Sequence, residues 1–111
     1  MRRSVLRLVA ALVVSAVGSV GSARAADSAD GRRLARQWCT TCHIVAPGTD
    51  GSDAAPPFES VANRPSLTEA GLRAWLTDPH PPMPNLNLGR AEIDAIVAYI
   101  KGTSKNPRPQ A

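Results

Sequence analysis

Large aromatic side chains are scarce in this sequence of 111 residues, which holds two tryptophans, one tyrosine and one phenylalanine. There are only two cysteines, and no apolar run approaches the roughly 20 residues that span a bilayer. A chain of this length forms at most one domain, with few bulky side chains for its core. The composition therefore predicts one small domain without a membrane-spanning helix in the mature chain.

An export signal is predicted at the N-terminus. Three arginines within the first seven residues precede residues 8–17, which are apolar except for Ser15, and small residues follow up to Ala23-Arg24-Ala25. This order is typical of a secretory signal peptide with an A-x-A cleavage site. We expect residues 1–25 to be removed after Ala25, which leaves an exported chain in the periplasm.

Excess positive charge is absent once that segment is removed. Residues 1–25 hold four of the thirteen Lys and Arg residues and none of the nine acidic ones, so the remainder has a formal net charge of zero. A neutral domain gains little from the counterion release that drives binding to nucleic acids. We therefore expect no nucleic-acid partner and only weak electrostatic steering toward protein partners.

Helical periodicity predicts three main helices, while no segment alternates with the period of a strand. Small and apolar residues recur at helical spacing in the first helix, whose start could be capped by Asp27, Ser28 or Asp30. Its stripe consists of Gly31, Leu34, Ala35, Trp38 and Cys42. The fold class is predicted to be all-α.

Two further helices have recognisable ends. A capping box at Ser66-Leu-Thr-Glu69 predicts a helix that continues through Leu72, Trp75 and Leu76 until Asp78-Pro79 stops it. The last helix is predicted from about Gly89 to Gly102, where the glycine would end it. It would bury one stripe, made of Ile93, Ile96, Val97 and Ile100.

Proline and glycine dominate the connections. They forbid a long regular element in residues 44–64, although residues 58–62 could form a short helical turn. Residues 80–85 contain three prolines and are predicted to be stiff and extended.

A single domain is predicted over residues 26–103, and the polar tail 104–111 is predicted to be disordered. A small domain with a loop as long as residues 44–64 usually needs an additional stabilising element, and a large cofactor would supply it.

The segment Cys39-Thr-Thr-Cys42-His43 has the C-x-x-C-H spacing of haem c attachment. Residues three and four apart share one face of a helix, so both thiols and the imidazole can contact the same bound group. The two cysteines can add to the vinyl groups of one haem, and His43 can then bind its iron.

Three other interpretations use the same residues. A thioredoxin-like redox pair would require a βαβ context, which the helical pattern lacks. A structural zinc site would combine His80 with Cys39, Cys42 and His43. A plain disulfide is the third alternative, because export places the cysteines in an oxidising compartment.

Met83 is the candidate for the second axial ligand of the iron. A lone methionine usually fills a core, but this one lies in Pro-Pro-Met-Pro, where a rigid backbone holds a flexible thioether. The prolines and the C-x-x-C-H motif together favour Met83 as a ligand, with His80 as the alternative.

Over residues 31–101 the sequence resembles the class I cytochromes c. This resemblance implies three main helices and a long loop wrapped around one covalently attached haem. Gly31 is similar to the small residue at which the family's first helix crosses its last one, and Tyr99 is similar to its aromatic partner. The loop from Pro79 to Met83 is short, as in compact bacterial members.

The resemblance also implies roles for loop residues. The carbonyl of Pro56 would accept the Nδ1 hydrogen of His43, and Phe58 would pack on the haem. Arg64 would face a haem propionate, unless it is a solvated loop charge, although Asn63 stands where the family usually has glycine. Trp75 would donate to a propionate or to the thioether sulfur, the alternative being a buried core tryptophan.

The implied function is that of a monomeric one-electron carrier rather than an enzyme. A dehydrogenase, a quinol-oxidising complex or a terminal oxidase would be its redox partner. Two alternatives remain, the first being a dedicated haem subunit of one periplasmic oxidoreductase complex. The second is a gas or redox sensor, in which Met83 would leave the iron.

Overall fold

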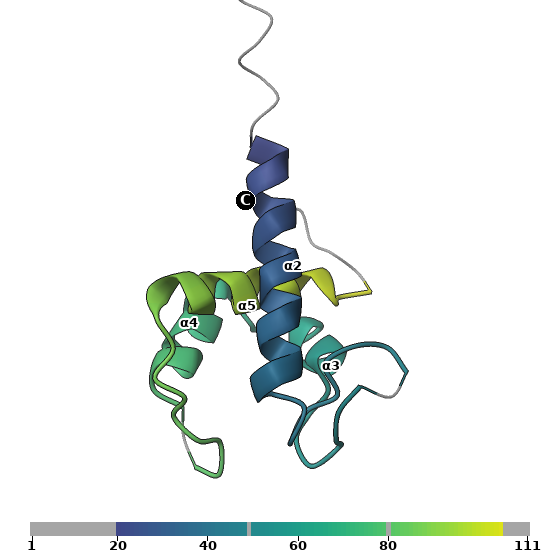
Figure 1. Ribbon diagram of the computed structural model, residues 1–111. Helices are drawn as coiled ribbons and strands as arrows, with labels where there is room; N and C mark the ends of the chain where they lie inside the picture. Colours follow the sequence, from purple (N-terminus) through teal and green to yellow (C-terminus); the bar gives the residue numbers. More distant parts are fainter. Residues whose placement is uncertain (1–19, 49, 80, 106–111) are drawn as a thin grey trace, which may run out of the picture.

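The computed structural model describes residues 20–48, 50–79 and 81–105, which contain four α-helices (Figure 1). These are α2 (Val20–Trp38), α3 (Phe58–Ala62), α4 (Glu69–Thr77) and α5 (Arg90–Gly102). Within these ranges the β-type pairing consists of one isolated antiparallel bridge, between Ile44 and Gly51. The predicted all-α class is confirmed, and α3 is the expected short helical turn.

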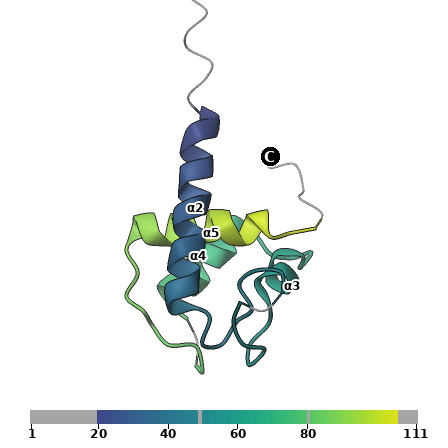
Figure 2. The same cartoon turned by 45° about the vertical axis from the view of Figure 1, so that its right-hand side comes forward.

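Helix α5 is the centre of the packing, since the other three helices all contact it. In both views α2 lies across α5 (Figures 1 and 2). At this crossing a Cβ on Gly31 would overlap the backbone carbonyl of Ala95 and lie 2.8 Å from the Cβ of Tyr99. Only glycine permits so close an approach of two backbones, which confirms the predicted crossing at Gly31.

The core consists of the inward faces of the four helices and the segments that join them. The predicted stripe of α5 is buried, and it packs with Leu34, Ala35, Phe58, Leu72 and Leu76. The predicted stripe of α2 is only partly right, because Trp38 is 48% exposed and Cys42 is also exposed. Since α2 crosses α5 rather than running beside it, the end of the stripe is left uncovered.

Helix α2 begins earlier than predicted. It starts at Val20, so the expected cap residues Asp27, Ser28 and Asp30 all lie within it. Residues 20–29 contain no proline and four alanines, so nothing in that stretch stops a helix. The predicted signal-peptide boundary after Ala25 falls inside α2, and residues 1–19 lie outside the described part of the chain.

The later helix ends are set by short polar contacts. Thr68, not Ser66, caps α4, because its hydroxyl accepts a hydrogen bond from the Gly71 amide at 3.0 Å. Gly89 caps α5, and its amide donates to the Glu92 carboxylate at 2.8 Å. Gly102 is the last residue of α5 rather than the residue after it.

Two connecting segments differ from the expectation. The proline-rich stretch turns at Pro81 and Pro82 before continuing irregularly to α5, so it is not extended throughout. The first residues of the C-terminal segment contact α3 and its C-cap. The Ser104 hydroxyl donates to the side-chain oxygen of Asn63 at 2.7 Å, and Lys105 forms an ion pair with Glu59. Residues 106–111 lie outside the described residues.

In the ranges that the structure describes, none of the helices combines the length and apolar character needed to cross a bilayer.

Candidate functional site

The C-x-x-C-H motif forms one additional helical turn beyond the end of α2. The amide of Cys39 donates to the Ala35 carbonyl at 2.9 Å, and the amide of His43 donates to the Cys39 carbonyl at 2.9 Å. This is the four-residue spacing of an α-helix. The motif therefore keeps Cys39 and His43 one turn apart, as its spacing predicts.

The two cysteines are both free thiols in different environments. Cys39 is 9% exposed and belongs to the core, whereas Cys42 is at the surface. Burial raises the pKa of the Cys39 thiol to about 11, because desolvation disfavours the charged thiolate. Before a haem is attached, the Cys39 side chain is therefore a neutral thiol at neutral pH.

His43 is half-buried and is oriented by one hydrogen bond. Its Nδ1 lies 2.7 Å from the carbonyl oxygen of Pro56, which is the contact that the resemblance implied. A carbonyl only accepts, so Nδ1 carries the hydrogen. Nε2 is consequently the nitrogen left to bind a metal.

The loop that follows holds the backbone of the motif. Ala55 donates its amide to the Cys42 carbonyl at 2.7 Å, and Ser52 donates to the His43 carbonyl at 3.3 Å. Gly51 has φ +128°, and a Cβ there would overlap the His43 carbonyl. The dipeptide Asp50-Gly51 indicates a turn, but no sequence pattern indicates that Gly51 packs against His43.

Phe58 lies beside the histidine. Its side chain is buried, with its ring centroid 5.4 Å from that of His43 and 6.3 Å from that of Tyr99. The three rings thus form a continuous row from α5 to the motif.

Met83 reaches the core from the connection between α4 and α5, where it is partly buried against the core side chains. Figures 1 and 2 show this green connection on one side of the C-terminal end of α2 and the loop after His43 on the other side. The candidate sulfur ligand and the candidate nitrogen ligand therefore belong to separate segments that flank the same helix end. His80, the alternative ligand, lies outside the described residues.

The remaining predicted residues line the periphery. Arg64 is exposed, two residues after the end of α3. Trp75 is 46% exposed, so the alternative of a buried core tryptophan is wrong. Leu72 and Leu76 occupy the inward face of α4, and Trp75 lies beside that face.

The donor set fits a haem of the c type better than the alternatives. An imidazole with Nε2 left over, a thioether and two free thiols three residues apart are the groups that such a haem uses. Among the described side chains, no three from His, Cys, Asp and Glu gather into a metal cluster. The helical fold and this site together define a small class I c-type cytochrome.

Comparison with known proteins gives the family. Residues 26–100 match the family described as cytochrome c oxidase, cbb3-type, subunit III, and the chain belongs to this family. It is 46% identical over 90 residues to cytochrome c-552 of Bradyrhizobium diazoefficiens, a match that covers 80% of this chain and 86% of that protein. No solved structure matches. The chain is an electron-transfer cytochrome, which sets aside the thioredoxin-like, zinc and plain disulfide interpretations.

Proposed function

We propose that this chain is a periplasmic electron carrier with one haem attached to Cys39 and Cys42. The iron would lie between Nε2 of His43 and the sulfur of Met83. The observation that carries this proposal is the 2.7 Å contact between Nδ1 of His43 and the Pro56 carbonyl, which leaves Nε2 as the ligand atom. When bound, the haem supplies reversible one-electron exchange at its iron.

The protein side chains suit a carrier rather than an enzyme. His43 and Met83 would fill both axial positions, so a substrate would have to displace one of them. A thioether is a soft ligand, and a His/Met pair raises the reduction potential relative to two nitrogens. The loop hydrogen bonds hold His43 in one orientation, which keeps its geometry alike in both oxidation states.

Charge distribution and size favour transient partners. Among the described residues, positive and negative side chains lie next to one another and form ion pairs, including Arg33–Asp30, Arg73–Asp94 and Lys105–Glu59. Charges paired in this way would steer a partner only weakly, so docking would be brief and small in area. The partners would be a dehydrogenase, a quinol-oxidising complex or a terminal oxidase, and the carrier would be monomeric.

A second candidate is a dedicated haem subunit of one oxidoreductase complex. The family's description, which names an oxidase subunit, favours it. Co-purification with other chains at fixed stoichiometry would support the subunit. A monomer that exchanges electrons in second-order reactions with added partners would support the carrier.

The carrier proposal predicts that the reduced protein does not bind carbon monoxide at neutral pH, because Met83 occupies the site that the gas needs. Absorption spectra of the reduced protein, recorded with and without carbon monoxide, measure this directly. Rapid formation of a carbon monoxide complex would instead indicate a gas sensor.

The rates of electron exchange with added partners should change only a few-fold between low and high salt, since electrostatic steering is weak.

A further inference from the structure

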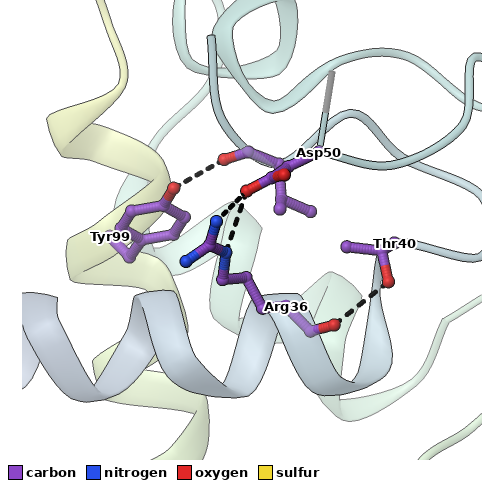
Figure 3. Close-up of polar contacts among 5 residues, drawn as sticks. Arg36, Thr40, Asp50 and Tyr99 are labelled. Atoms are coloured by element: carbon purple, nitrogen blue, oxygen red, sulfur yellow. Dashed lines mark hydrogen bonds and ion pairs between the residues drawn. The ribbon is translucent and has the colours of Figure 1, made fainter. Parts of the chain in front are cut away.

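We propose that Tyr99 of α5 is a positioning residue for His43, and that Arg36 of α2 is a weaker second support. This inference rests on the proposed role of His43 as an iron ligand. The Tyr99 hydroxyl donates to the Val45 carbonyl at 2.6 Å, and the Arg36 guanidinium binds the Asp50 carboxylate (Figure 3). We refer to Arg36, Val45, Asp50 and Tyr99 as the loop clamp.

The clamp fixes the backbone on which His43 lies. Val45 follows His43 by two residues and is fully buried. Its amide donates to the Asp50 carbonyl at 2.9 Å, and two residues further along Ser52 donates to the His43 carbonyl. Tyr99 and Arg36 therefore hold both sides of the same narrow loop, one from each of the two crossing helices.

Tyr99 also acts through the row of aromatic rings. Its ring meets that of Phe58 edge to face at 6.3 Å, and Phe58 meets His43 at 5.4 Å. Pro56, which accepts the His43 hydrogen, precedes Phe58 by two residues. Tyr99 thus supports both partners of the hydrogen bond between His43 and Pro56, the imidazole and the segment that carries the acceptor.

The two arms of the clamp differ in strength. The side chains of Arg36 and Asp50 are 51% and 37% exposed, so water and salt screen their attraction. The Tyr99 hydroxyl is partly buried, and its acceptor belongs to a residue that is fully buried. Removing this donor leaves a buried carbonyl without its partner, which is the costlier loss.

Loss of the Tyr99 hydroxyl should reach the iron through His43. A freed Val45 carbonyl would let the loop move, and the hydrogen bond from Nδ1 to Pro56 would open more often. That hydrogen bond raises the basicity of the imidazole and so stabilises oxidised iron. Weakening it should shift the reduction potential upward without changing the ligands.

The test compares haem-loaded variants of the full protein. Solvent exchange of the His43 Nδ1 hydrogen is measured by NMR in the reduced state, together with the midpoint potential. Tyr99→Phe keeps the ring and should speed this exchange about tenfold, the loss expected for one hydrogen bond, and raise the potential. Arg36→Gln should produce a smaller increase that disappears at high salt.

Arg73→Gln is the matched control, because it breaks the ion pair with Asp94 between α4 and α5 and the ion pair with Glu69 within α4, and leaves the loop clamp intact. It should change neither quantity. The inference is overturned if Tyr99→Phe exchanges within twofold of the wild type, or if Arg73→Gln accelerates exchange equally. Should Tyr99→Phe fail to load haem, Arg36→Gln at low salt decides, since an unchanged exchange rate there overturns the inference as well.

Failure of this inference can be told apart from failure of the proposed function. The proposed function is overturned if the wild-type protein has no attached haem. It is also overturned if the wild-type protein does not show the absorption of an iron–thioether bond. A normal wild-type spectrum with unaltered exchange in the variants overturns only the role of Tyr99.

Discussion

Replacing Met83 with alanine is expected to abolish the weak far-red absorption of the oxidised protein and to lower its reduction potential. In the proposed site this absorption would arise from the bond between iron and the thioether sulfur of Met83, which alanine cannot form. Axial ligands set haem potentials over a wide range, so the decrease should be on the order of 100 mV or more. Spectra of the oxidised protein and a redox titration measure the two effects.

Leu88→Ala is the matched control for Met83→Ala. Leu88 belongs to the same connection between α4 and α5, and like Met83 it is partly buried against the core. Its truncation removes apolar contacts but no sulfur, so the far-red band should remain. If the band also remains in Met83→Ala, the ligand assignment is wrong, and His80→Ala becomes the variant to examine.

Gly31→Val is expected to lower the free energy of unfolding by about 3 kcal/mol, at the upper end of overpacking costs. The new side chain would overlap the Ala95 carbonyl, which is backbone and cannot turn aside, so α2 and α5 must separate. For a domain of this size the melting temperature should fall by roughly 10 °C or more. Thermal unfolding of the haem-loaded protein, followed by circular dichroism, provides the measurement.

Gly102→Ala serves as its control, because the nearest atom to a Cβ there is the Ser28 hydroxyl oxygen at 4.0 Å. Alanine also favours helix over glycine, so stability should be unchanged or slightly greater. Equal melting temperatures for Gly31→Val and the wild type would refute the claim that the crossing depends on glycine.

Features with a strong local pattern could be predicted from the sequence. The C-x-x-C-H spacing placed two thiols and an imidazole in one turn, and the apolar repeat of α5 identified its buried face. Gly31 and the contact between His43 and Pro56 followed from the order of residues around the motif, through resemblance to a family. The first two features are encoded in short stretches of sequence, whereas the last two required the family resemblance.

Features that depend on tertiary geometry could not be predicted. Trp38 has the right spacing for the buried face of α2, yet it is exposed because α5 crosses that helix nearer to Gly31. Ser66 and Thr68 are both acceptable caps, and only the folded loop selects Thr68. Tyr99 and Val45 are 54 positions apart, so no local sequence pattern predicts their hydrogen bond.

We propose that a haem, bound through Cys39 and Cys42, completes this domain. The decisive experiment is mass spectrometry of the denatured protein, purified from the periplasm of cells that mature such cytochromes. We predict the mass of residues 26–111 plus one haem, retained after denaturation and lost when both cysteines are replaced by serine. A folded protein without iron, or a haem that separates on denaturation, would show that the haem is not attached through these cysteines.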